Sequence, residues 1–221
     1  MSLRARIDSE RGKFDIVLDD DEFPGIFAEV IGQWDQLIED HPDVPRYREE
    51  RAITRGNYGR ALLWGGRVQE AAEMLELARS SFALALAERQ PGTDPETDRR
   101  AKSYLNDGLA HVLVEMGNVA LATNQPETAQ QHYQAAIDVR QRLPLRADYL
   151  RKLSELLASC PDKSLRNPKA AVQAASQAVR LAERNGPALS ALGMAQLRDG
   201  QVAAAVGSIE KARKLRIYPH C

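Results

Sequence analysis

The sequence is poor in aromatic residues and contains no long apolar run. Phenylalanine, tryptophan and tyrosine make up 5% of the 221 residues. No stretch of valine, isoleucine or threonine alternates with polar residues as a half-buried strand would. A membrane-spanning helix would need about 18 consecutive apolar residues, and the chain has no such run. These absences argue against a β-rich fold and a membrane span, whereas abundant alanine, leucine, arginine and glutamate favour helices.

Cysteine is also scarce. The two cysteines, Cys160 and Cys221, lie far apart and outside any C-x-x-C spacing, which argues against a disulfide framework or a cysteine zinc site. The terminal pair His220 and Cys221 is a weak metal-ligand pattern. The amino terminus has no apolar core of the kind found in signal peptides. We therefore expect a cytoplasmic protein with no metal site and no cofactor.

Neither sign of charge dominates. The formal net charge is −1, and basic and acidic residues are interspersed along the chain. A basic field of the kind that attracts nucleic acid or an anionic membrane is missing. The clusters around Arg99 to Lys102 and Lys211 to Arg216 have the pattern of solvated helix faces. The sequence therefore predicts neither nucleic-acid nor membrane binding.

Catalytic motifs are absent as well. The chain has no phosphate-binding loop, no G-x-S-x-G and no H-E-x-x-H. Its four histidines are isolated from one another, and its carboxylate pairs stand in charged stretches without the burial that tunes a catalytic acid. No residue is predicted to be catalytic, and we expect a protein that is not an enzyme.

The sequence does contain a succession of helix signals. Apolar residues recur with the helical period between breaks made by proline, glycine and asparagine. Asn167 before Pro168 has the pattern of a helix cap, and Asn124, Gly66 and Gly200 suit left-handed turn positions. The expected helices span residues 24–40, 46–63, 68–88, 96–122, 126–142, 146–159, 168–183, 189–198 and 202–216.

Small residues repeat on a fixed grid across these helices. Gly59, Gly117 and Gly193 are each followed by alanine twelve and nineteen residues later. The glycine is unfavourable within a helix, so we interpret it as the place where the next helix approaches closely. The alanines that follow the three glycines are Ala71 and Ala78, Ala129 and Ala136, and Ala205 and Ala212.

A fourth copy of the grid is imperfect. Ser154 stands where glycine is expected, and Ala171 and Ala178 keep the later spacing. The extra residues lie in the irregular segment CPDKSLRNP. In the last helix we expect the apolar residues to face inward and the polar ones outward. The inward set is Val202, Ala205, Val206, Ile209, Ala212 and Leu215, and the outward set is Ser208, Glu210, Lys211 and Lys214.

These residues resemble the tetratricopeptide repeat family, whose helix-turn-helix repeat carries Leu-Gly-x-x-Tyr in its first helix and spaced alanines in its second. The matching first-helix pairs are Tyr58-Gly59, Met116-Gly117, Leu153-Ser154 and Leu192-Gly193. The large aromatic expected three residues after the glycine is missing from every repeat. The long spacing between the first repeats is similar to stretched bacterial and kinesin-light-chain-like arrays.

The resemblance implies an all-α fold, a right-handed α-solenoid of helix-turn-helix repeats. We expect a flexible charged segment at residues 1–22, the solenoid at 23–216 and a short tail at 217–221. Within the solenoid we expect a leading half-repeat and four full repeats. They span residues 24–41, 46–90, 96–143, 146–184 and 187–216.

The first helices of such repeats line a concave groove that binds peptides in this family. Positions two before, one after and five after each glycine share one helix face. Some of these side chains could together receive a carboxylate, and Trp64 could anchor a partner or fill a gap against the helix of Trp34. The predicted groove residues are Asn57, Arg60, Trp64, His111, Glu115, Asn118, Arg151, Lys152, Glu155, Met194 and Arg198.

The predicted function is therefore a non-catalytic protein-protein interaction module that presents this groove to a peptide or protein. An alternative is a regulatory or scaffolding segment of a larger serine/threonine-kinase-like signalling protein. A helical-repeat enzyme would need a deep pocket with converging titratable groups, and a nucleic-acid binder would need a basic groove. The sequence indicates neither, and it does not specify the partner or the oligomeric state.

Overall fold

The computed structural model describes residues 23–89 and 94–217, and all regular structure in these ranges is helical. The predicted segment 1–22, the start of the predicted turn at 91–98 and the residues from 218 onward lie outside the described ranges. Packing divides the chain into two units, Met1–Ala87 and Glu88–Cys221, which are described in turn. No helix of the described residues is both long enough and apolar enough to cross a membrane.

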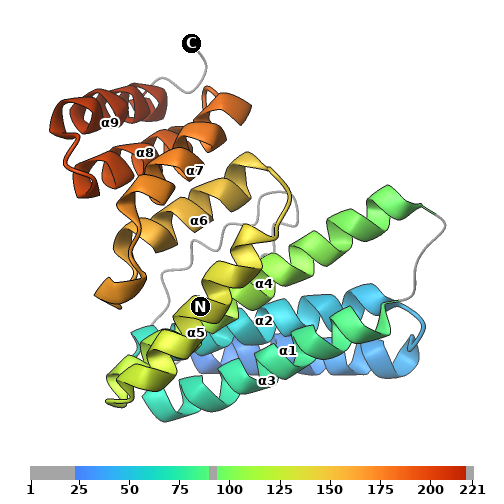
Figure 1. The fold of residues 1–221 in the computed structure, drawn as a ribbon. Helices are drawn as coiled ribbons and strands as arrows, with labels where there is room; N and C mark the ends of the chain where they lie inside the picture. Colours follow the sequence, from blue (N-terminus) through green and yellow to red (C-terminus); the bar gives the residue numbers. More distant parts are fainter. Residues whose placement is uncertain (1–22, 90–93, 218–221) are drawn as a thin grey trace. The chain divides into compact units, whose positions relative to one another are not determined.

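The described part of the first unit, from Phe23 onward, contains three helices (Figure 1). They are α1 (Phe23–Asp40), α2 (Pro45–Trp64) and α3 (Val68–Glu88), whose last residue falls just past the unit boundary. The ring of Phe27 on α1 stacks on Tyr58 of α2, with 5.0 Å between the ring centroids. The indole Nε1 of Trp34 donates a hydrogen bond to Thr54 Oγ1 at 3.1 Å. These contacts fix α1 along α2.

Over residues 94–217, the second unit contains six α-helices and one short 3₁₀ turn. Consecutive helices pack against each other, and α6 also packs against α8, as expected for stacked helix hairpins (Figure 1). The 3₁₀ turn lies in the segment predicted to be irregular. The elements are α4 (Pro95–Ala122), α5 (Pro126–Gln141), α6 (Ala147–Ser159), η1 (Lys163–Leu165), α7 (Pro168–Leu181), α8 (Gly186–Arg198) and α9 (Val202–Ile217).

The three repeat glycines are contact points between paired helices, as predicted. A Cβ atom added to Gly59 would lie 2.6 Å from Leu75 Cγ, and one on Gly117 would lie 2.5 Å from the ring of Tyr133. At Gly193 the added atom would lie 2.6 Å from Ile209 Cγ1. All three distances are too short for a real side chain, so only glycine permits this approach.

The alanines of the grid are all buried. The eight predicted alanines expose between 0% and 7% of their surface. Ser154, which replaces the glycine of the third repeat, is also fully buried. The repeated small residues therefore form the inner faces of the hairpins, where the helix axes approach closely.

The turns have the predicted chemistry. Asn124, Gly66 and Gly200 adopt left-handed backbone conformations, with φ of 57°, 75° and 78°. The Asn167 side chain caps α7 by accepting a hydrogen bond from Ala170 N at 3.0 Å. Asn185 caps α8 in the same way, which was not predicted, and α8 begins at Gly186 and not at the predicted residue 189.

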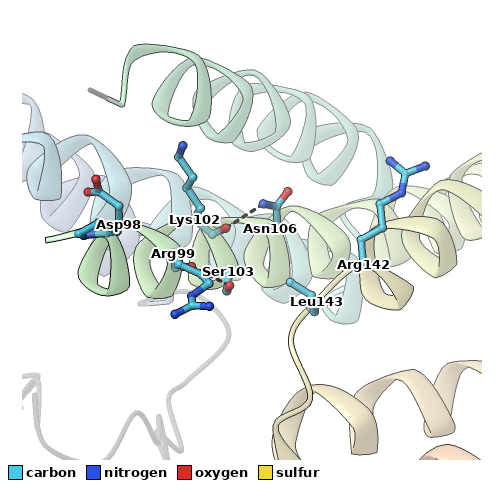
Figure 2. A pocket seen from close by; sticks show the side chains of 8 residues that line it. Asp98, Arg99, Lys102, Ser103, Asn106, Arg142 and Leu143 are labelled. Carbon is cyan, nitrogen blue, oxygen red and sulfur yellow. Dashed lines mark hydrogen bonds between the residues drawn. The ribbon is translucent and has the colours of Figure 1, made fainter. Parts of the chain in front are cut away.

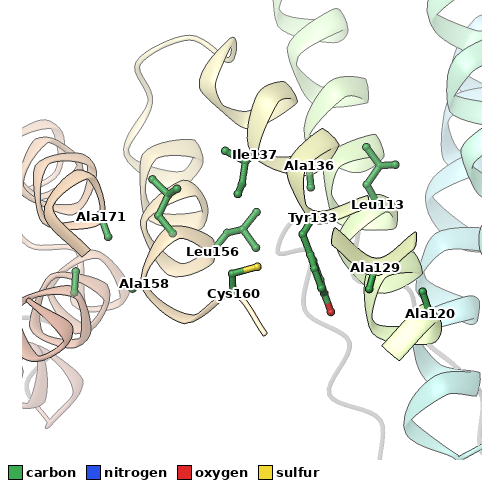
Figure 3. Packing of buried hydrophobic residues seen from close by; sticks show 12 residues of the cluster. Leu113, Ala120, Ala129, Tyr133, Ala136, Ile137, Leu156, Ala158, Cys160 and Ala171 are labelled. Atoms are coloured by element: carbon green, nitrogen blue, oxygen red, sulfur yellow. The ribbon is translucent and has the colours of Figure 1, made fainter. Parts of the chain in front are cut away.

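The core of the second unit surrounds Tyr133. Figure 3 shows this ring with Leu113 and Ala120 of α4 on one side, and with Leu156 of α6 and Cys160, the residue after α6, on the other. Tyr133 and Cys160 are fully buried, and burial raises the pKa of both groups. Cys160 is thus a neutral core residue in the folded protein.

The orientation predicted for the last helix was partly wrong. Val202, Val206 and Ile209 expose 48% to 58% of their surface, whereas Ser208 is buried and donates its hydroxyl to Gln196 Oε1 at 2.8 Å. The close approach at Gly193 places small side chains at the α8–α9 interface. Ile209 lies at the edge of this interface, where its Cγ1 atom still approaches Gly193, and Val202 and Val206 are exposed.

Candidate partner-binding surface

The predicted groove residues fall into two groups, one in each unit. Three of them, Asn57, Arg60 and Trp64, lie on α2 of the first unit. The other eight lie on α4, α6 and α8 of the second unit, which are the predicted first helices of its repeats. We call these eight residues the first-helix face. They are His111, Glu115, Asn118, Arg151, Lys152, Glu155, Met194 and Arg198.

Trp64 of the first unit is largely exposed. Its accessible fraction is 77%, and the Arg60 guanidinium carbon lies 5.1 Å from the centre of its ring. Such a cation-π contact holds the indole at the end of α2. Trp64 therefore does not fill a gap against α1, and its role as a partner anchor stays a prediction.

Asp107 organises the polar network of the second unit. Its buried carboxylate accepts hydrogen bonds from Arg140 Nη1 at 3.0 Å and from Lys152 Nζ at 2.5 Å. These two contacts join α4 to both α5 and α6. The network thus fixes the position of Lys152 on the first-helix face.

Arg140 is the most deeply buried member of this network. Its side chain is 5% exposed, and burial lowers the pKa of the guanidinium, while the nearby Asp107 partly opposes that change. The group remains charged at neutral pH because an arginine pKa starts far above it. Removing Asp107 would leave a buried charge without its carboxylate, an arrangement that typically costs about 3–5 kcal/mol.

Arg151 lies between two carboxylates of its own helix. Its Nη1 is 2.7 Å from Glu155 Oε1, and its Nη2 is 3.0 Å from Asp148 Oδ1. Burial alone would lower the pKa of Arg151, but the attraction of Glu155 and Asp148 outweighs it and the pKa is raised. Because Arg151 and Lys152 already have carboxylate partners, an incoming carboxylate would have to compete with them.

Asn118 and Glu115 are also held internally. Asn118 Nδ2 donates to Glu115 Oε2 at 2.9 Å, and Asn118 Oδ1 accepts from the Tyr133 hydroxyl at 2.7 Å. His111 Nε2 lies 3.9 Å from Glu115 Oε1, one helical turn away. The α4 part of the first-helix face is therefore tied to the core through Tyr133.

The α8 part of the face is open and partly apolar. Met194 exposes 45% of its surface, and Arg198 at the end of the helix is exposed. Leu197 beside them is 54% exposed. An adaptable thioether next to a cation is a common feature of protein-binding surfaces.

Sequence reasoning missed Asp107, Arg140 and Tyr133. A partial signal existed, because Asp107, His111 and Glu115 are spaced by four residues and so share one stripe of α4. Arg140 is 33 residues from Asp107 along the chain, and only the folded hairpin brings them together. Within residues 23–89 and 94–217, no group of three metal-ligating side chains is placed to hold an ion.

Comparison with solved structures finds helical proteins of similar extent but limited geometric agreement. A crystal structure of MamA is 17% identical, covers 92% of this chain and 98% of its own, and has a TM-score of 0.40. BtubC (BKLC) from P. vanneervenii is 13% identical, with coverages of 89% and 91% and a TM-score of 0.38. These scores are too low to establish a shared arrangement of the whole chain.

Comparison of the sequence with protein-family models gives a clearer result than the solved structures do. No curated protein matches the chain. The tetratricopeptide repeat family model matches residues 114–159 and 163–220, which cover the end of α4 and all the helices that follow it in the second unit. These residues include Gly117, Ser154 and Gly193 with their buried alanines. The carboxyl-terminal part of the chain, from residue 114 onward, therefore matches the tetratricopeptide repeat family.

Proposed function

We propose that this chain is a non-catalytic protein-protein interaction module whose first-helix face binds an extended segment of a partner protein. The observation that carries the proposal is the polar network that joins the first helices. Lys152 of α6 binds Asp107 of α4, and α6 packs against α8. Side chains from three repeats are thereby held on neighbouring helices, which suits a segment that extends across repeats.

A surface of this kind is organised before its partner arrives. Arg151, Lys152 and Asn118 are held by hydrogen bonds to neighbouring helices or to adjacent turns of their own helix. Side chains that are already ordered lose little rotamer entropy when a partner binds. Affinity would then come from the open α8 end, where Met194 offers apolar area.

The charge pattern favours a partner segment of mixed or neutral polarity at this face. Glu155 pairs with Arg151 and Asp107 pairs with Lys152, so both cations are paired within the protein. A strongly acidic segment would gain little from cations that are already neutralised. Uncharged polar groups and short apolar side chains would meet no such competition.

The test is a comparison of matched charge changes. A partner captured with the wild-type protein is purified, and its affinity is measured for a Met194→Glu, Arg198→Glu variant and for a Gln173→Glu, Arg180→Glu control. Both variants add the same charge, but the control residues are exposed on α7, a second helix. We expect the face variant to weaken binding about tenfold or more, equivalent to about 1.4 kcal/mol, and the control to leave it unchanged. Equal affinities of the two variants would contradict the proposal.

The alternative of a regulatory or scaffolding segment in a larger kinase-like signalling protein stays a prediction. Such a segment would use the same face, so the binding test applies to both. The proposal includes no reaction step, and none of the polar residues of the first-helix face is assigned a catalytic role.

A further inference from the structure

The longest helix of the second unit extends well beyond its partner. α4 has 28 residues and α5 has 16. Near the end of α5, Arg140 meets Asp107, so the turns of α4 before Asp107 have no α5 residue opposite them. This overhang is about 18 Å long at 1.5 Å per residue. After α5 the chain turns away through Arg142 and Leu143 toward Pro144.

A pocket lies between this overhang and the exit from α5. Its volume is about 460 Å³, a size in the usual range for ligand sites. Figure 2 shows side chains from α4 and from the two residues that follow α5, Arg142 and Leu143, around it. The lining residues are Pro95, Asp98, Arg99, Lys102, Ser103, Asn106, Arg142 and Leu143.

The lining has an excess of positive charge. Arg99 pairs with Glu96, and Asp98 lies 3.8 Å from Arg89. Lys102 and Arg142 have no ion-pair partner among the residues that the structure describes, unlike Arg151 and Lys152 on the first-helix face. Lys102 on α4 and Arg142 just after α5 thus border one recess with their charges uncompensated.

Polar and apolar groups complete the lining. Asn106 Nδ2 donates to Lys102 O at 2.8 Å, which leaves its second N–H and its Oδ1 available. The Ser103 hydroxyl donates to Arg99 O at 2.7 Å, so it has no donor left for a carboxylate and can only accept, for example from a peptide N–H. Leu143 and Pro95 add apolar contact area. This combination suits a carboxylate carried on a short aliphatic stem.

We propose that this pocket binds a carboxylate-bearing peptide segment of a partner protein. Lys102 and Arg142 supply charge-assisted hydrogen bonds to the carboxylates, and Asn106 supplies a further donor. Asp98 in the lining disfavours a densely charged phosphate group. The pocket shares no residue with the first-helix face, so it is a second binding surface whose test is independent of the proposed function.

The probe is a fluorescein-labelled hexaglutamate peptide, with hexaglutamine as the uncharged comparison, and binding is followed by anisotropy at low salt. We expect the wild-type protein to bind hexaglutamate and not hexaglutamine. A Lys102→Gln, Arg142→Gln variant should bind about tenfold more weakly or worse, because two charge-assisted contacts are lost. The control variant Lys169→Gln, Arg180→Gln removes the same charge from the exposed side of α7 and should bind within about twofold of wild type.

A second pair of variants tests the pocket without removing a cation. Asn106→Glu places a carboxylate in the recess and should abolish binding, whereas Asn106→Gln should retain it. Equal losses in the two cation variants would show attraction by overall charge and would overturn the proposal. So would failure of the wild type to bind hexaglutamate, or displacement of the peptide by an equal concentration of inorganic phosphate. Circular dichroism melts of all four variants confirm that they are folded.

Discussion

Ser154 shows what happens when the repeat position carries a side chain. It occupies the place of Gly117 and Gly193 in its own repeat and is fully buried. Its hydroxyl oxygen has no hydrogen-bond partner among the described residues. A buried hydroxyl without a partner loses its interactions with water and gains nothing in return. The serine side chain is therefore small enough for the site, but the site offers its hydroxyl no hydrogen-bond partner.

Replacement of Ser154 with alanine should raise the free energy of unfolding by about 1 kcal/mol, because an unsatisfied polar atom is removed without loss of Cβ packing. Ser208→Ala is the matched comparison, since Ser208 is also buried but donates to Gln196. That change should lower the unfolding free energy by about 1 kcal/mol. Urea denaturation of both variants measures the two signs. A loss of stability in Ser154→Ala would refute this explanation.

At the scale of the helices, the start and stop signals were read well from the sequence. Proline begins α5 and α7, asparagine caps α7, and left-handed residues follow α2, α4 and α8. These signals are local, because one side chain or one backbone angle produces each of them. Which residues of α9 are buried was predicted poorly, because this depends on how α9 packs against α8. α9 approaches α8 closely at Gly193, and Ala205 and Ala212 are buried. The pattern of apolar residues within α9 does not show which of its faces meets α8.

The asparagine caps give a prediction at this scale. Asn167→Ala and Asn185→Ala should each lower the unfolding free energy by about 1 kcal/mol, because Ala170 N and Ala188 N would lose their side-chain acceptors. Asn167→Asp and Asn185→Asp keep the acceptor oxygen and should remain near wild type. Thermal melts followed by circular dichroism distinguish the two sets. Equal melting temperatures for alanine and aspartate variants would show that these caps do not stabilise α7 and α8.

At the scale of the whole molecule, the sequence predicted the repeat better than it predicted the site. The spacing of glycine and alanine is periodic along the chain and reports directly on the hairpin interfaces. The network around Asp107 depends on residues 33 and 45 positions away, and no repeat connects them. The predicted division into one half-repeat and four repeats stays a prediction. The packing boundary at Ala87 falls close to the predicted end of the first full repeat at residue 90.

The central claim is that glycine at the repeat position is required by close helix approach. It is tested most directly by alanine substitution of five glycines, with unfolding free energies from urea denaturation. Gly59, Gly117 and Gly193 face Leu75, Tyr133 and Ile209, whereas Gly32 and Gly207 are helical glycines with open space beside them. The account predicts that alanine costs about 1–3 kcal/mol at the three contact glycines and stabilises by about 0.5–1 kcal/mol at the two open ones. Stabilisation at all five positions would contradict it.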